Sequence, residues 1–109
     1  MVCVQLSDLR KFTATLLRGA GMSTENAEIM TDIYMRATLR GVGHNDIYDL
    51  PGRLKSYVGG KIKINPDIRL INGLNALESY DGDNGPGELR CSHIMDRAGE
   101  LADKYGIVL

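Results

Sequence analysis

The sequence predicts a mostly α fold with one small β-hairpin. Apolar residues recur at helical spacing in four stretches, and glycine follows each stretch. Between the third and fourth stretches, a short β-type segment surrounds an Asn-Gly pair, which is typical of a hairpin. The length of 109 residues suits one small domain, so we expect residues 1–109 to form a single helical domain.

Two helices are expected between residues 7 and 43. Ser7 begins the first and Ser23 or Thr24 the second, because a hydroxyl can accept a hydrogen bond from a backbone N–H of the first turn. Glycine then ends each helix, since it adopts the left-handed conformation that a helix C-terminus favours. The expected apolar faces are Leu9, Phe12, Leu16 and Leu17 in the first helix and Ala27, Met30, Ile33, Tyr34 and Ala37 in the second.

A third helix is expected from Asp49 to Val58. Asp49 can cap it, and Pro51 is tolerated in a first turn because its missing N–H would have no partner there. The expected buried side consists of Leu50, Leu54, Tyr57 and Val58. A hairpin follows within residues 61–80, with Asn72-Gly73 as its predicted turn.

The last helix is expected from Glu88 to Tyr105, and Gly106 ends it. Its expected inward residues are Leu89, Met95, Ala98, Leu101, Ala102 and Tyr105. The apolar triplet 107–109 comes directly afterwards, which is how a buried strand begins in an α/β unit. We therefore expect a domain truncated at the start of a strand; the alternative is a frayed apolar C-terminus.

Composition excludes several classes of protein. The formal net charge is −1 with both signs interspersed, whereas a nucleic-acid binder usually carries a basic face. No apolar run approaches the roughly 18 residues that a membrane span requires, and the first residues lack a signal-peptide pattern. Two cysteines are too few for a disulfide framework. We therefore expect a cytoplasmic protein without nucleic-acid or membrane partners.

The segment 39–46 carries the most informative candidate for chemistry. Histidine titrates nearest neutral pH, so His44 suits proton transfer to or from a substrate hydroxyl. Gly41 and Gly43 let the backbone bend sharply before it and leave the ring uncrowded. From composition alone, the alternative of a loop or capping histidine stays open.

Two other motifs fail their tests. The acidic turn 81–88 resembles a calcium loop, but Pro86 and Ser92 occupy the positions of the required glycine and bidentate acid. As a nucleotide loop, it has Arg90 in place of the third glycine and two aspartates that would repel a pyrophosphate. Cys91 and His93 lack the further ligands that zinc needs. We therefore expect no metal-binding and no cofactor-binding residue in this chain.

An ordered set of short motifs spans the whole chain. The motifs are Arg40-Gly41, His44, Leu50-Pro51, Gly60-Lys61-Ile62, Asp81-Gly82 and Gly106-Ile107. In this order they resemble the amino-terminal part of the malate/L-lactate dehydrogenase family, which also includes ureidoglycolate dehydrogenase and the diketogulonate reductases.

The resemblance implies the N-terminal helical, substrate-side part of a larger α/β (non-Rossmann) oxidoreductase. Such enzymes interconvert small 2-hydroxy acids and 2-keto acids by hydride transfer, use NAD or NADP, and usually form homodimers. It implies that His44 is the proton donor or a substrate contact, although other members use a second histidine that would lie beyond Leu109. The cofactor would belong to the full-length parent, with none bound by this fragment.

The chain departs from the family pattern around the histidine. Gly43 replaces the family's serine and Asn45 its glycine, and Tyr48 stands where an arginine would pair with a substrate carboxylate. Arg53 or Arg40 is the candidate substitute, so Tyr48 and Arg53 are the expected substrate-binding residues. The alternative to an oxidoreductase fragment is a stand-alone helical protein-interaction module without catalytic activity.

Overall fold

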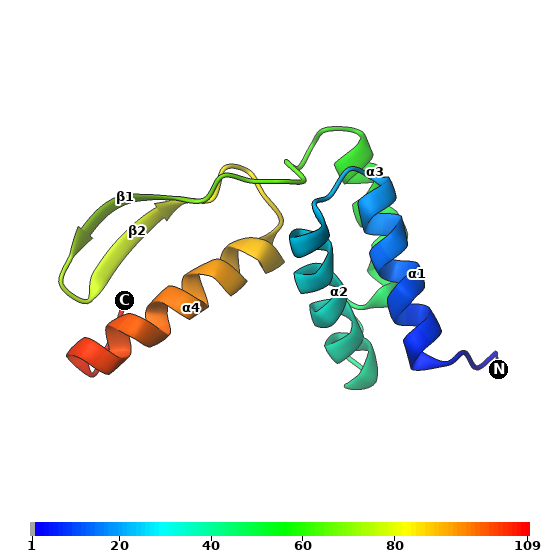
Figure 1. The fold of residues 1–109 in the computed structure, drawn as a ribbon, viewed down its shortest axis with the longest axis horizontal. Helices are drawn as coiled ribbons and strands as arrows, with labels where there is room; N and C mark the ends of the chain where they lie inside the picture. The colour runs from blue at the N-terminus through cyan, green and yellow to red at the C-terminus, as the bar shows by residue number, and fades with distance from the viewer. Residues whose placement is uncertain (1) are drawn as a thin grey trace. The chain divides into compact units, whose positions relative to one another are not determined.

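The computed structural model describes residues 2–109, so Met1 of the expected domain lies outside the described residues. The chain divides into two compact units, which meet between Asn65 and Pro66 in the sequence. The elements of the first unit are α1 (Leu6–Gly19), α2 (Thr24–Leu39), a short 3-10 helix η1 (Ile47–Asp49) and α3 (Leu50–Val58) (Figure 1). Those of the second are β1 (Arg69–Leu74), β2 (Leu77–Asp81) and α4 (Gly87–Tyr105). The predicted mostly α fold with one hairpin is confirmed.

The core of the first unit lies where α1 packs on α2. Its buried apolar residues are Ala14, Leu17, Met22, Ala27, Met30, Tyr34, Met35, Leu50 and Tyr57. The prediction for Phe12 was wrong, because its side chain is 59% exposed and the contact face of α1 lies at Thr13, Ala14 and Leu17. Thr13 is buried at no hydrogen-bonding cost, since its hydroxyl donates to the Leu9 carbonyl at 2.8 Å.

The two predicted N-caps have different outcomes. Ser23 caps α2, and its Oγ accepts from the Asn26 backbone N–H at 3.2 Å. Ser7 does not cap α1, because the helix begins at Leu6 with Gln5 as its N-cap and Ser7 lies inside the first turn. Asn65 secures the same α1–α2 corner, accepting at Oδ1 from the Ser23 N–H at 2.8 Å. Its Nδ2 donates to the Gly21 carbonyl at 2.9 Å, which holds the end of the unit against the corner.

Helix α3 begins and ends close to its predicted bounds. Pro51 lies in its first turn as expected, but the Asp49 side chain forms no cap hydrogen bond with the helix. Leu50 and Tyr57 are buried, whereas Val58 is exposed, so the predicted buried face was wrong at its last residue. Val58 is followed directly by the turn at Gly59 and Gly60, where the chain leaves the helix.

The hairpin turn lies three residues after the predicted one. Leu74 pairs with Leu77, so the loop is Asn75-Ala76, while Gly73 pairs with Glu78 inside the ladder. The prediction of Asn72-Gly73 was wrong because Asn75 is the residue with a left-handed backbone, at φ 54°. A register irregularity between Leu70 and Asn72 also shifts the pairing, which an alternation pattern does not reveal.

Helix α4 ends at Gly106 as predicted, with φ 79°. Leu89 and Leu101 are buried, but Met95 and Tyr105 are exposed, which corrects the expected inward face. After the helix, the Leu109 N–H donates to the Ala76 carbonyl at 2.8 Å and the Leu109 carbonyl accepts from the Glu78 N–H at 3.2 Å. These two bonds follow the pattern of a parallel strand pair beside β2.

Candidate functional site

His44 lies in the loop that joins α2 to η1. Arg40 caps the end of α2, and Gly41 then takes a positive φ of 67° that turns the chain away from the helix axis. His44 is exposed, and no residue from 2 to 109 forms a hydrogen bond or ion pair with its imidazole. The ring is therefore presented to solvent by the loop backbone alone.

The chain immediately after His44 is tied to α2 and η1. Asp46 is 6% exposed, and its Oδ1 accepts from the Tyr48 N–H at 3.0 Å. The Thr38 hydroxyl on α2 accepts from the Ile47 N–H at 3.2 Å and donates to the Tyr34 carbonyl at 2.8 Å. These bonds fix where the loop enters η1.

Asn45, next to His44, is held from both its main chain and its side chain. Its backbone has a positive φ of 59°. The Asp49 Oδ2 accepts from the Asn45 N–H at 2.6 Å, and the Asn45 Oδ1 accepts from Arg53 Nη2 at 2.5 Å. Asp49, which the sequence presented as a helix cap, thus anchors the loop instead.

The predicted site residues come from one short stretch of the first unit. Tyr48 lies on η1 with 86% of its surface exposed, and Arg53 lies half-buried on α3. Arg53 donates a hydrogen bond to the side chain of Asn45, the residue directly after His44. Whether His44, Tyr48 and Arg53 contact a substrate stays a prediction.

Sequence reasoning missed Asn45, Asp46 and Asp49 as anchors of this loop. One signal was present: asparagine occupies the position after His44 where the family pattern has glycine. Asparagine is among the few side chains that tolerate the left-handed region, so this replacement indicated a preserved turn with an added polar group.

The acidic turn 81–88 is filled by its own neighbours. A Cβ on Gly85 would collide with the Pro66 ring, so this glycine is there for close packing. The Asp81 carboxylate accepts from the Asp83 N–H at 2.8 Å, and the Asp83 carboxylate accepts from the Asp67 N–H at 2.7 Å. The turn thus packs on Pro66 and carries carboxylates. That it binds no dinucleotide stays a prediction.

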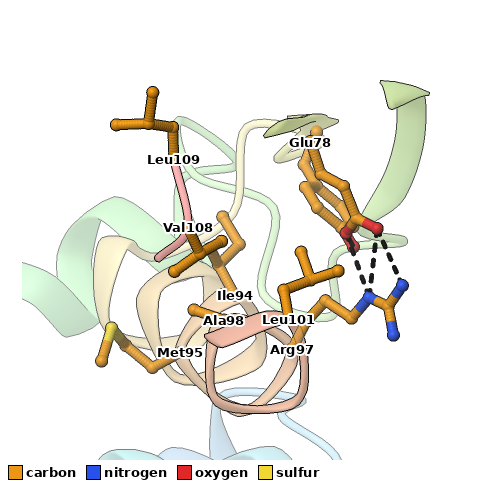
Figure 2. Close-up of a pocket in the computed structure, with 9 residues that line it drawn as sticks. Glu78, Ile94, Met95, Arg97, Ala98, Leu101, Val108 and Leu109 are labelled. Carbon is orange, nitrogen blue, oxygen red and sulfur yellow. Dashed lines mark hydrogen bonds and ion pairs between the residues drawn. The ribbon is translucent and has the colours of Figure 1, made fainter. Parts of the chain in front are cut away.

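The second unit has a groove of about 260 Å³ between β2, α4 and the C-terminal residues (Figure 2). Its apolar lining consists of Ile94, Met95, Ala98, Leu101, Val108 and Leu109. Glu78, Tyr80 and Arg97 stand along its polar side.

The polar side chains along this groove form hydrogen bonds with one another. Arg97 Nη2 donates to Glu78 Oε1 at 2.8 Å, and the Tyr80 hydroxyl donates to Glu78 Oε2 at 2.6 Å, as Figure 2 shows for the Arg97–Glu78 pair. Arg97 also pairs with Glu100 at 2.6 Å. The Arg97 hydrogen bond, followed by that from Tyr80, lowers the pKa of Glu78. This cluster joins β2 to α4 and has a structural role.

Residues 2–109 show neither a metal-binding cluster nor a membrane-spanning helix. That range holds no group of three or more histidine, cysteine, aspartate and glutamate side chains placed to bind a metal ion. None of its helices has the length and hydropathy needed to cross a membrane.

The sequence profile of the malate/L-lactate dehydrogenases matches residues 4–109, and the chain belongs to this family of oxidoreductases. Among curated relatives, 2,3-diketo-L-gulonate reductase from Klebsiella pneumoniae is 30% identical over 106 residues, which cover 97% of this chain and 32% of that protein. The same enzyme from Citrobacter koseri is 28% identical with the same coverage. The chain thus spans about a third of the length of the curated relatives it matches.

Solved structures agree with this assignment. The malate dehydrogenase of Pyrococcus horikoshii superposes with a TM-score of 0.91 at 28% identity, covering 96% of this chain and 30% of that one. The sulfolactate dehydrogenase of Methanocaldococcus jannaschii gives a TM-score of 0.88 at 25% identity, covering 94% of this chain and 30% of that one. The predicted family is therefore confirmed.

Proposed function

We propose that the chain is part of an NAD(P)-dependent oxidoreductase that interconverts small 2-hydroxy acids and 2-keto acids by hydride transfer, and that His44 carries the proton. Family membership supports the class of reaction, since the matched relatives are named as malate and sulfolactate dehydrogenases and a diketogulonate reductase. The observation that carries the role of His44 is its exposed ring in a loop whose following residues are anchored.

The proposed step is a proton transfer at the substrate oxygen. A secondary alcohol becomes a ketone only when the hydroxyl proton leaves together with the hydride, and reduction returns both. A neutral imidazole nitrogen of His44 accepts that proton during oxidation, and the resulting imidazolium returns it during reduction. Because no side chain among residues 2–109 forms a hydrogen bond with the ring, the ring is available to a substrate hydroxyl.

The substrate carboxylate would be bound by residues of the same stretch. Guanidinium groups match carboxylates in bidentate geometry, so Arg53 is the proposed partner, with Arg40 as the second candidate. Arg53 Nη2 donates to Asn45 Oδ1, and that bond places the guanidinium beside the His44 loop. Tyr48 contributes an exposed hydroxyl from η1.

The nicotinamide cofactor is assigned in this proposal to residues outside this chain. The acidic turn 81–88 is the segment whose glycine content most resembles a phosphate loop, and its aspartates, which would repel a pyrophosphate, support this assignment. A cytoplasmic homodimer is the accompanying expectation.

The test compares alanine variants of the two histidines in the longer protein that carries this segment. His44→Ala should lower kcat by about 10²–10⁴-fold if His44 carries the proton, whereas a mainly raised KM would assign it to substrate contact. His93→Ala is the matched control. His93 lies on α4, outside the His44 loop, and its ring packs against that of Tyr80 at a centroid distance of 6.0 Å. Wild-type kinetics in the His44 variant would remove this residue from the site.

A further inference from the structure

The His44 imidazole has no side-chain partner among residues 2–109, so its placement depends on the backbone that carries it. That backbone includes Asn45, which holds a positive φ of 59°. Most side chains avoid this region, and glycine or asparagine occupies it most readily. A conformation of this kind persists where neighbouring contacts enforce it.

Two side chains enforce it here. Asp49 accepts from the Asn45 main-chain N–H at 2.6 Å, and Arg53 donates to the Asn45 side-chain oxygen at 2.5 Å. Asp49 ends η1 and Arg53 lies on the first turns of α3, so both anchors belong to one continuous helical segment. The main chain and the side chain of Asn45 are thus fixed to the same support.

We infer that Asn45 is a positioning residue for His44, and that Arg53 and Asp49 act through it by holding the loop in the conformation that presents the imidazole. The inference rests on the proposed function of His44. A glycine after the histidine could not support the loop in this way, because glycine allows the same φ but has no side chain through which neighbouring residues can fix it.

The first experiment measures the loop in this 109-residue chain by ¹⁵N relaxation. Asn45→Gly keeps the backbone conformation accessible and removes the amide that Arg53 binds. The order parameters of residues 43–46 should fall from about 0.85 in the wild type toward 0.6 or below in the variant. Asn75→Gly is the matched control, because Asn75 has the same kind of backbone conformation in the hairpin, at φ 54°. Unchanged order in the Asn45 variant would overturn the inference.

A second comparison tests the bond to Arg53. Arg53→Ala should loosen the loop as Asn45→Gly does, whereas Arg53→Lys should restore part of the order, since an ammonium can still donate to the Asn45 oxygen. Equal order in the alanine and lysine variants would contradict a role through this bond.

The third measurement uses kinetics of the longer protein. Asn45→Gly should lower kcat by about tenfold to a hundredfold, because a small misplacement of a catalytic group is costly. The same substitution should have no further effect when His44 is already alanine, since the two changes then remove one function. If His44→Ala lowers kcat but Asn45→Gly does not, the positioning role is wrong and the proposed function stands. If His44→Ala has wild-type kinetics, both are wrong.

Discussion

Glu78 makes the stability of the second unit depend on pH. Its carboxylate accepts from Arg97 and from the Tyr80 hydroxyl, and these bonds lower its pKa below the ordinary 4.5. A group whose pKa is lower in the folded than in the unfolded chain stabilises the fold above the unfolded value. That stabilisation is lost as the pH falls through the folded pKa.

We therefore expect Glu78→Gln to destabilise the protein at neutral pH and much less in acid. Glutamine keeps the shape of the side chain but lacks the charge that Arg97 binds. Thermal melting, monitored by circular dichroism from neutral pH to well below 4.5, should show the melting temperatures of the two proteins converging in acid. Glu100→Gln is the control, because Glu100 is more exposed than Glu78 and bonds Arg97 through one oxygen. A wild-type advantage that persists undiminished in acid would contradict this account.

At the same scale, the sequence located His44 and its loop but not the residues that hold it. Glycine spacing and the histidine itself are visible in the chain, and they correctly marked a bend between two helices. The hydrogen bond from Arg53 to Asn45 depends on where α3 lies after the turn, which no local pattern specifies. The substitution of asparagine for the family's glycine was the one visible signal.

At the scale of elements, the two serine candidates for helix caps form a matched pair. Ser23 accepts from the Asn26 N–H and caps α2, whereas Ser7 lies inside α1. Ser23→Ala should lower the free energy of unfolding by about 1 kcal/mol, because the cap hydrogen bond is lost. Ser7→Ala should change it by less than about 0.5 kcal/mol. Urea unfolding of both variants measures the difference; equal values would mean that the α2 cap contributes nothing.

The elements also show which patterns predict structure well. Helical periodicity with a terminal glycine placed α2 and α4 to within a residue or two at each end, because these signals are local. The hairpin turn was misplaced because both Asn72-Gly73 and Asn75 are turn-type sequences. Gly73 pairs with Glu78 in the ladder, so the turn lies at Asn75. This pairing is a contact between two strands, and the local sequence does not specify it. Phe12 was assigned to the core for a similar reason, since periodicity does not say which of two adjacent faces meets α2.

At the scale of the whole molecule, burial is distributed unevenly between the two units. Among the described residues, Pro86, Leu89 and Leu101 are the buried large apolar side chains of the second unit, and the others lie in the first. Every residue of β1 is exposed, and an isolated two-stranded hairpin is marginal in water. We therefore expect the first unit, with its α1–α2 core, to resist unfolding more than the second unit.

Amide hydrogen exchange of the 109-residue chain should reveal this difference directly. Amides of α2 around the fully buried Met30 and Tyr34 should exchange slowest, since they open only when the core does, while β1 and β2 amides should exchange through local opening. Leu17→Ala should reduce the protection of α1 and α2 by about 2–5 kcal/mol, because Leu17 is completely buried and its loss leaves a cavity. Leu74→Ala, at an exposed position of β1, should leave the α1 and α2 amides unchanged. Hairpin amides that exchange more slowly than those of α2 would contradict this assignment of the stable core.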